Sequence, residues 1–529
     1  MDEVVAQDSV RQDGVARVDT KGRLLTRRSL LLGFGVGGIG VAGGAALLRA
    51  GGRSAAPVNV GPDSALVLAA ERARARTGRI VPVSLAAAVG VADLGGRQVP
   101  AWLYNGTLPG PEIRVAVGDQ LDVTLRNALP EPTSIHWHGV ALRNDMDGMP
   151  GLTQDPIAPG GTFRYRFVVP DPGTYFFHPH SGLQLDRGLA SALVVEDPSE
   201  PAVGDVEAVL LLDDWTMGVG RDPHAVYTDL QANGMNAMNG MNGMNGMNGT
   251  GKASRTNAMA TAARPLGADG GDVAYPLHLV NGRTPQDPYV VSARPGQRVR
   301  LRLVNAGADS AYRVAVGGHR LTVTHADGFP VRPVEVDTLV IGMGERYDVV
   351  VTAASGVFPI AVVREGKDDP PARALLRTAP GATPEVGARP IEMDGRLLSY
   401  ADLSPTAGTA LSAARPVSTL RYRLAMSTTG YKWTINDQTF DERRADQVQA
   451  GQRIRLEFTN TSSMFHPMHL HGHTFAIVGT GARKDTINVA PMQTVAVDVQ
   501  TDNPGQWMMH CHNAYHLEAG MATSLSYVT

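Results

Sequence analysis

One phrase of alternating apolar and polar residues occurs three times, and it constrains the fold more than any other feature of the sequence. The three copies lie at residues 115–125, 292–302 and 449–456. Each copy leads to an asparagine: Asn127, Asn305 and Asn460. Repetition at intervals of about 160 to 180 residues indicates three related domains, which a chain of 529 residues is long enough to form.

The same pattern predicts β-strands. Alternation at a period of two is typical of strands with one buried face, and it recurs at residues 113–117, 121–125 and 163–167. Turns rich in glycine and proline separate these segments. Many short strands at this spacing favour an all-β fold of Greek-key sandwiches. We place the three domains at residues 64–198, 205–380 and 390–529.

One segment of the second domain departs from this pattern. From Gln231 to Thr250 the sequence repeats methionine, asparagine and glycine, with a methionine at every third position from Met235 to Met247. Spacers that are polar or lack a side chain cannot bury a core, so we predict a mobile insertion over about residues 231–262.

The first 56 residues are predicted to be an export signal rather than part of the fold. Arg27 and Arg28 precede a weakly apolar, glycine-rich run over residues 33–48. A twin-arginine pair at this place indicates a Tat-type signal, with the Tat machinery as a partner and a periplasmic, cell-envelope or extracellular location. An uncleaved membrane anchor is the alternative, and the glycines of the run weaken it.

Composition excludes other classes of protein. The formal net charge is −3 and charged residues make up 19% of the chain, whereas a nucleic-acid partner usually requires a basic excess. The single cysteine, Cys511, excludes an intramolecular disulfide.

Histidines carry the predicted chemistry, because ten of the fifteen fall in four short clusters. The clusters are His136 and His138; His178 and His180; His466, His469 and His471; and His510, His512 and His516. Two histidines separated by one residue on a strand present both imidazoles on one face, and four such pairs supply enough rings for about three metal ions. Imidazole suits copper, zinc, iron and nickel, so the pairs alone do not identify the metal. The second domain carries no such cluster, so we expect it to space the outer two domains.

The fourth cluster favours copper. Cys511 is followed by His516 five residues later and by Met521 five beyond that, which with the distant His466 is the donor set of a blue-copper site. On an extended strand the two histidines beside Cys511 point away from the thiolate, so the thiolate and its neighbours would face different ions. Structural zinc, the alternative, favours four closed ligands and often several cysteines.

With these motifs the chain resembles the three-domain multicopper oxidases, the family of laccases and bacterial copper-tolerance cuprous oxidases. The likeness covers nearly the whole chain after the signal region and is greatest to exported actinobacterial members. It implies three cupredoxin-like domains and four copper ions, of which one is type 1, one is type 2 and two are type 3.

The resemblance also implies a role for each ligand. The type 1 site, where electrons enter, would consist of His466, Cys511, His516 and the axial Met521. The type 2 ligands would be His136 and His469. The type 3 ligands would be His138, His178 and His512 on one copper, and His180, His471 and His510 on the other.

Two acidic positions bear on proton supply. Asp147 matches an acidic residue of the family that would help deliver protons to reduced oxygen, and a turn-forming aspartate before Gly148 is the alternative. Some bacterial cuprous oxidases have a glutamate directly after the second type 1 histidine. Here that position is Leu517 and the glutamate is Glu518, which departs from the family's relay.

The resemblance implies an oxidoreductase that takes electrons singly from a small reductant and reduces O2 to water. We expect Cu(I) as the reductant, in copper detoxification, because thioethers like those of the methionine repeat select Cu(I). A laccase acting on phenols or other organic donors is one alternative, and a copper-sequestering protein without turnover is another. Five histidines match no ligand position and are predicted to be structural: His224, His278, His319, His325 and His473.

Overall fold

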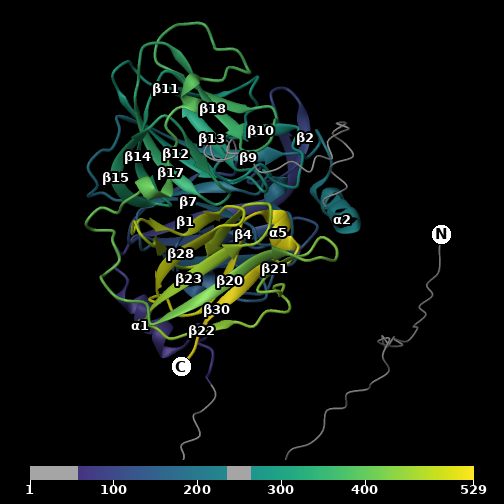
Figure 1. Ribbon diagram of the computed structural model, residues 1–529, viewed down its shortest axis with the longest axis vertical. Helices are drawn as coiled ribbons and strands as arrows, with labels where there is room; N and C mark the ends of the chain where they lie inside the picture. The colour runs from purple at the N-terminus through teal and green to yellow at the C-terminus, as the bar shows by residue number, and fades with distance from the viewer. Residues whose placement is uncertain (1–56, 235–263) are drawn as a thin grey trace, which may run out of the picture. The chain divides into compact units, whose positions relative to one another are not determined.

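The computed structural model describes residues 57–234 and 264–529 (Figure 1). The predicted Tat-type signal and the methionine repeat from Met235 onward lie outside these residues. Within the two described ranges, no helix is long and apolar enough to cross a membrane.

The first domain is a pair of four-stranded sheets that follows helix α1 (Ala65–Ala73). Its strands are β1 (Ile80–Asp93), β2 (Gln98–Tyr104), β3 (Ile113–Ala116), β4 (Gln120–Ala128), β5 (His136–His138), β6 (Thr162–Val168), β7 (Gly173–His178) and β8 (Ser191–Glu196). The sheets have the orders β2-β1-β4-β6 and β3-β8-β7-β5. Short 3₁₀ helices η1 (Asn144–Met146) and η2 (Leu185–Arg187) lie in its loops.

The second domain is a pair of sheets with six and five strands. Its strands are β9 (Val206–Trp215), β10 (Leu277–Val280), β11 (Tyr289–Ser292), β12 (Arg298–Asn305), β13 (Tyr312–Val316), β14 (Leu321–Ala326), β15 (Phe329–Val336), β16 (Leu339–Ile341), β17 (Arg346–Thr352), β18 (Val357–Arg364) and β19 (Ala372–Arg377). The orders are β10-β9-β12-β17-β14-β15 and β11-β19-β18-β13-β16. Helix α2 (Pro223–Asn233) extends into the first residues of the predicted insertion.

The third domain has the same plan. Its strands are β20 (Ser418–Met426), β21 (Trp433–Ile435), β22 (Asp446–Val448), β23 (Arg453–Asn460), β24 (His466–Leu470), β25 (Phe475–Ile477), β26 (Arg483–Lys484), β27 (Thr486–Val489), β28 (Thr494–Gln500), β29 (Gln506–Cys511) and β30 (Ala522–Tyr527). The orders are β21-β20-β23-β28-β25-β26 and β22-β30-β29-β24-β27. Helices η3 (Ile391–Asp394) and η4 (Tyr400–Asp402) precede these strands, and α5 (Ala514–Glu518) joins the last two.

The second half of each repeated phrase begins the same strand in each domain. This strand is β4, β12 or β23, and it pairs parallel with the first strand of its domain, β1, β9 or β20. On its other side it pairs antiparallel with β6, β17 or β28. The predicted all-β class with three cupredoxin-like sandwiches is therefore confirmed.

The asparagine that follows each copy closes an identical turn. In every case the side-chain oxygen accepts the main-chain N–H two residues later at 2.9 Å. The side-chain NH2 of Asn127, Asn305 or Asn460 then donates to two main-chain carbonyls of neighbouring segments. Because a short amide can replace backbone partners in an irregular turn, the repeat fixes both a strand and the loop beyond it. In the first and third domains that loop leads directly into a histidine cluster.

Candidate metal centres

Three donors of the third domain converge on one point. Cys511 ends β29, His466 begins β24 and His516 lies in α5, and all three side chains are fully buried. The Cys511 Sγ lies 3.6 Å from the Nδ1 atoms of both histidines, which are 3.2 Å apart. A thiol and two ring nitrogens at these distances enclose a position for one metal ion.

Local structure brings these donors together. Strands β24 and β29 are antiparallel neighbours, which sets His466 close to the end of β29. The Asn513 side chain then caps α5 by accepting the N–H groups of Tyr515 and His516. The chain returns at Met521, whose carbonyl accepts the Cys511 N–H at 3.0 Å and whose side chain is buried.

The electrostatics of this site suit a cation. Burial lowers the pKa of His466 and lowers that of His516 to about 3, so both rings are neutral. Burial raises the pKa of the Cys511 thiol, which therefore needs a bound cation to become a thiolate. The outer ring nitrogens are engaged: His466 Nε2 lies 2.8 Å from the Ser462 hydroxyl, and His516 Nε2 donates to Asp272 Oδ2 at 3.1 Å. These contacts leave both Nδ1 atoms for the metal.

Eight further histidines form a second centre between the first and third domains. The first domain supplies His136, His138, His178 and His180, and the third supplies His469, His471, His510 and His512. Four triads among them have ligand atoms within 4.8 Å of one another. The triads are His136, His138 and His469; His136, His180 and His471; His138, His178 and His512; and His469, His471 and His510.

The ring nitrogens of this second centre fit a metal cluster. Seven buried ring nitrogens among its members have no hydrogen-bond partner: Nε2 of His136, His178, His180 and His469, Nδ1 of His138, and both nitrogens of His512. Unpaired polar atoms are costly inside a protein unless they bind something. Burial also lowers the pKa of seven of the rings, which keeps them neutral: His138, His178, His180, His469, His471, His510 and His512.

Outer contacts select the nitrogen that each ring presents. The Nδ1 atoms of His136, His178 and His510 contact main-chain carbonyls at 2.8 to 3.0 Å, which leaves Nε2 facing inward. His138 is the reverse case, because its Nε2–H donates to Asp485 Oδ1 at 3.1 Å and its Nδ1 remains free. A hydrogen bond to one nitrogen of an imidazole determines which nitrogen can bind a metal.

Asp147 is both a turn residue and a partner of the second centre. It follows η1, and Gly148 after it has φ of +85°. Its buried carboxylate accepts from His471 Nδ1 at 2.9 Å, and its carbonyl accepts from His136 Nδ1 at 3.0 Å. The residue therefore occupies the predicted turn and also contacts two rings of the second centre, while its part in proton delivery stays a prediction.

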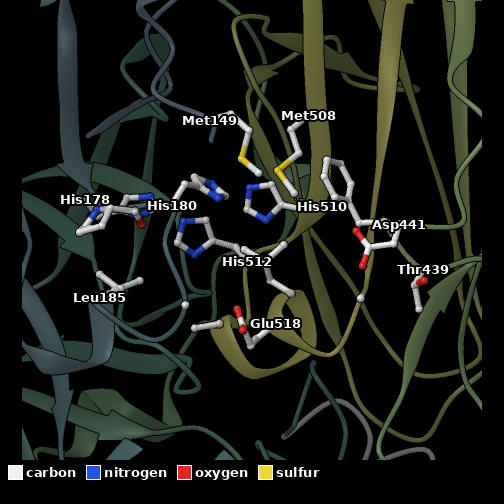
Figure 2. Close-up of a pocket in the computed structure, with 16 residues that line it drawn as sticks. Met149, His178, His180, Leu185, Thr439, Asp441, Met508, His510, His512 and Glu518 are labelled. Atoms are coloured by element: carbon white, nitrogen blue, oxygen red, sulfur yellow. The ribbon is translucent and has the colours of Figure 1, made fainter. Parts of the chain in front are cut away.

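A cavity of about 210 Å³ borders the second centre (Figure 2). The histidines on its wall are His178, His180, His510 and His512. Figure 2 shows the sulfur atoms of Met149 and Met508 beside them, with Glu518 on the other side of the rings. Burial raises the pKa of Glu518. An acid therefore borders this cavity, although the sequence places it one residue later than the relay glutamate of some relatives.

The five histidines predicted to be structural lie outside the groups of converging donors found in the described residues. His473, the nearest in sequence, donates or accepts at 2.6 Å with the Tyr527 hydroxyl. His278 contacts the Tyr312 hydroxyl, His325 contacts Glu200, and His319 accepts the Ala354 N–H. His224 lies at the start of α2.

Three residues of these centres were not predicted from the sequence. Asp272 bonds to His516, Asp485 bonds to His138, and Arg346 holds Asp485 in a two-point ion pair. None belongs to a motif with the metal ligands. The only local signal is the run of charges at residues 483–485, which would be unusual in a buried strand.

Comparisons with known proteins agree with this arrangement. Three family profiles, each described as multicopper oxidase, match residues 87–200, 207–381 and 414–528. The multicopper oxidase MmcO of Mycobacterium tuberculosis is 46% identical, over 96% of this chain and 97% of that protein. A copper resistance protein A homolog of Pseudomonas syringae pv. tomato is 28% identical, over 81% of this chain and 89% of its own. The laccase from Botrytis aclada has a similar structure, with a TM-score of 0.67, 27% identity and coverage of 86% of this chain and 88% of that one.

Proposed function

Because the chain belongs to the multicopper oxidase family, we propose that it oxidises Cu(I) outside the cytoplasm and passes the electrons to O2, which is reduced to water. The carboxylate of Asp272 on the outer edge of His516 is the observation that carries the choice of Cu(I). Export through the Tat route belongs to the same proposal, and it rests on Arg27 and Arg28 in the sequence.

Four copper ions are assigned as the family pattern implies. The type 1 ligands are His466, Cys511, His516 and Met521, and the type 2 ligands are His136 and His469. The type 3 ligands are His138, His178 and His512 on one ion and His180, His471 and His510 on the other. Bound copper supplies the one-electron chemistry that these side chains lack. Cys511 connects the two centres, because the residues on either side of it, His510 and His512, both belong to the second centre.

Asp272 makes the outside of the type 1 site attractive to a cation. Its carboxylate accepts hydrogen bonds from His516 Nε2 and the Tyr431 hydroxyl, and 2% of its side chain remains exposed. Asp269, which is more exposed and lies 3.7 Å from Lys367 Nζ, is three residues earlier in the chain and acts electrostatically on His516. Two carboxylates favour the approach of a cation over that of a neutral phenol.

The same region is shielded from a bulky donor. His466 and His516 are both 0% exposed, and the Trp433 ring packs against His516 with centroids 4.1 Å apart. A phenol ring therefore reaches neither histidine directly. The hydrogen bond between Asp272 and His516 Nε2 offers a path to the type 1 site for an electron from a cation held nearby. The match to laccases keeps an organic donor as the alternative.

The described segments on either side of residues 235–263 both contact this part of the molecule. On one side, the Tyr227 hydroxyl of α2 donates to the Glu518 carbonyl of α5 at 3.0 Å. On the other, Asp269 forms a β-bridge with Met464, two residues before His466. A tether with such attachment points raises the local concentration of whatever it binds, and thioethers bind Cu(I).

The test compares oxygen consumption with Cu(I) and with a phenol in copper-loaded protein. We expect a higher kcat/KM for Cu(I) than for the phenol in the wild type. Because Asp272 also bonds His516, Asp272→Asn will affect both donors, but the ratio of the Cu(I) value to the phenol value should fall roughly tenfold, since losing one charge contact with the cation costs on the order of 1 kcal/mol. Asp446→Asn is the matched control, because Asp446 is also bonded by a tyrosine hydroxyl but contacts no metal ligand. Wild-type protein that turns over the phenol and leaves Cu(I) unused would favour the laccase alternative.

A second experiment isolates the methionine repeat. Deleting residues 235–250 spares α2 and removes all five of the regularly spaced methionines. The KM for Cu(I) should rise while kcat stays unchanged, because the type 1 site is intact. Equal Cu(I) kinetics at limiting copper in both proteins would exclude a capture role.

A further inference from the structure

We propose that Arg346, a residue of the second domain that binds no metal, positions the histidines of the second centre through Asp485. The proposal deepens the copper assignment above and rests on it. It gives the second domain a part in the metal site, although that domain supplies none of the assigned ligands.

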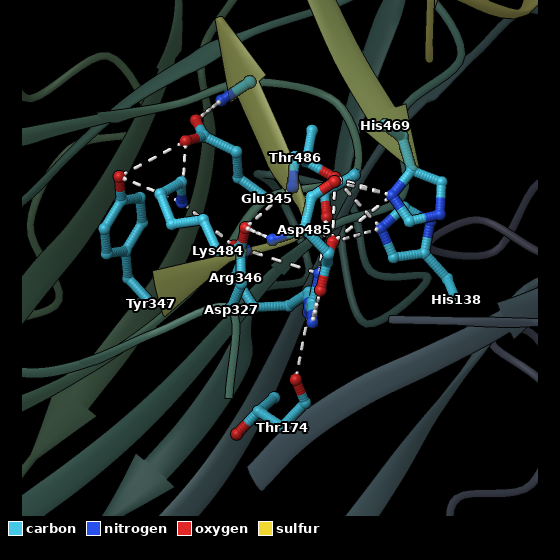
Figure 3. A network of polar contacts seen from close by, with 12 residues as sticks. His138, Thr174, Asp327, Glu345, Arg346, Tyr347, His469, Lys484, Asp485 and Thr486 are labelled. Carbon is cyan, nitrogen blue, oxygen red and sulfur yellow. Dashed lines mark hydrogen bonds and ion pairs between the residues drawn. The ribbon is translucent and has the colours of Figure 1, made fainter. Parts of the chain in front are cut away.

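The contact is a two-point ion pair in the interior (Figure 3). Arg346 Nη1 donates to Asp485 Oδ1 at 2.7 Å and Nη2 donates to Asp485 Oδ2 at 2.6 Å, and both side chains are fully buried. Two further donations, to the carbonyls of Thr174 and Gly344, fix the guanidinium in one orientation. A planar fork held at four acceptors determines the plane of the carboxylate that it grips.

Asp485 contacts two rings of the second centre from the other side. Its Oδ1 accepts from His138 Nε2 at 3.1 Å, and its carbonyl accepts from His469 Nδ1 at 3.0 Å. The Thr486 hydroxyl donates to the same Oδ1 at 2.9 Å. One residue thus orients a ring of the first domain and a ring of the third. Figure 3 shows His138 and His469 side by side next to Asp485.

A second layer of buried charge supports the pair. Asp327 accepts the main-chain N–H groups of Arg346, Asp485 and Thr486, at 2.9 to 3.1 Å. Lys484 Nζ lies 3.0 Å from carboxylate oxygens of both Asp327 and Glu345. Charges at this depth persist only when every partner is in place, so the group behaves as one unit.

The second domain also packs directly against the rings. A Cβ on Gly344, which has φ of +84°, would lie 2.9 Å from both His138 Cε1 and His512 Cδ2. The backbone of this segment therefore forms part of the wall of the second centre, two residues before Arg346. The His138 ring is therefore confined on two sides, because the Gly344 backbone packs against it and the Asp485 carboxylate bonds to it.

The consequence for the metal is a choice of nitrogen. With Asp485 fixed as an acceptor, the His138 proton stays on Nε2 and Nδ1 is presented to the ion. If the carboxylate turned, the ring would lose its charged partner and only the Thr486 hydroxyl, 3.2 Å from Nε2, would remain. Outer partners of this kind typically change metal affinity by about 10- to 100-fold.

The experiment uses full-length copper-loaded protein and the variant Arg346→Lys, which keeps the charge and loses the fork. A graded series of chelator concentrations is applied, total copper is measured, and type 1 copper is followed separately by its blue absorption. We expect the cluster copper of Arg346→Lys to be lost at roughly tenfold lower chelator, with the blue absorption retained. Asp485→Asn removes the charge of the acceptor and should also lose cluster copper at lower chelator while it stays blue. It replaces Arg346→Lys in the experiment if that variant does not fold.

Arg300→Lys is the matched control. Arg300 is also buried and donates through Nε and Nη2 to one carboxylate, that of Asp348, but neither residue contacts a ring of the second centre. The proposal would be overturned if the cluster copper of Arg346→Lys resisted the chelator as well as that of the wild type. It would also be overturned if Arg300→Lys lost its cluster copper at the same chelator concentration as Arg346→Lys. Absence of cluster copper from wild-type protein would instead refute the copper assignment itself.

Discussion

Adding a single methyl group at Gly148 should slow oxygen reduction and leave electron uptake at the type 1 site fast. A Cβ built on Gly148 lies 1.7 Å from the carbonyl oxygen of Ile135 and 2.9 Å from the main-chain nitrogen of His136. In Gly148→Ala one of the two backbones must therefore retreat by more than about 1 Å to reach ordinary van der Waals contact. If the segment of Ile135 moves, His136 is displaced. If the segment of Gly148 moves, Asp147 is displaced and its hydrogen bond to His471 is disturbed.

The expected magnitude follows from the size of that displacement. A misplacement of about 1 Å in a reacting arrangement lowers the rate about 100-fold, so kcat for oxygen consumption should fall by that order. Anaerobic reduction of the blue site by an excess of reductant should remain fast, because Gly148 lies in the first domain and the type 1 donors are in the third. Oxygen electrode measurements and stopped-flow absorption measure the two steps separately.

Gly151→Ala is the control for backbone strain. Gly151 has φ of +74° in the same loop but no atom within 4 Å of its Cβ position. Both variants place an alanine in the left-handed region, which lowers the free energy of unfolding by about 1 to 2 kcal/mol. Only in Gly148→Ala does the new Cβ also collide with the Ile135 carbonyl. If Gly148→Ala turned over oxygen as fast as Gly151→Ala, the claimed coupling between this turn and the second centre would be refuted.

Three other substitutions test the assignments. Cys511→Ser should abolish the blue colour and keep the cluster copper, measured by absorption and total copper, and a variant that stayed blue would refute the thiolate ligand. Met521→Leu should remain blue and raise the type 1 potential in a redox titration, since a weak donor that stabilises Cu(II) is removed; a lower potential would contradict an axial role. Asp147→Asn should slow oxygen turnover sharply while anaerobic type 1 reduction stays fast, because the amide cannot deliver a proton as the acid does. If both steps were unchanged, Asp147 would serve the turn alone.

Much of the fold could be predicted because its signals are local. Alternation at a period of two needs only a few residues, and Asn127, Asn305 and Asn460 mark the three copies by themselves. The candidate ligands fall within short clusters for the same reason: His-x-His pairs are fixed by the geometry of one strand.

The partners of those ligands could not be predicted, since they are distant in sequence. Asp272 is 244 residues from His516, and Arg346 is 139 residues from Asp485. No spacing rule relates such pairs, and only the packing of domains brings them together.

The second domain illustrates the same limit. Because it has no histidine cluster, its sequence predicts only a spacer between its neighbours. In the structure its Asp309 also accepts from Asn513 Nδ2 at 2.5 Å, beside α5, and its Gly344 packs against two rings. Carboxylates and glycines are too common in sequence to be recognised as parts of a distant site.

The ligands are divided unequally between the domains. All four residues assigned to type 1 copper come from the third domain, whereas the cluster takes four rings from the first domain and four from the third. A small shift of one domain against the other, which needs less energy than unfolding either, would open the cluster and leave the blue site whole. On warming, copper should therefore leave in a fixed order: the cluster empties first, and the colour fades only when the third domain itself melts.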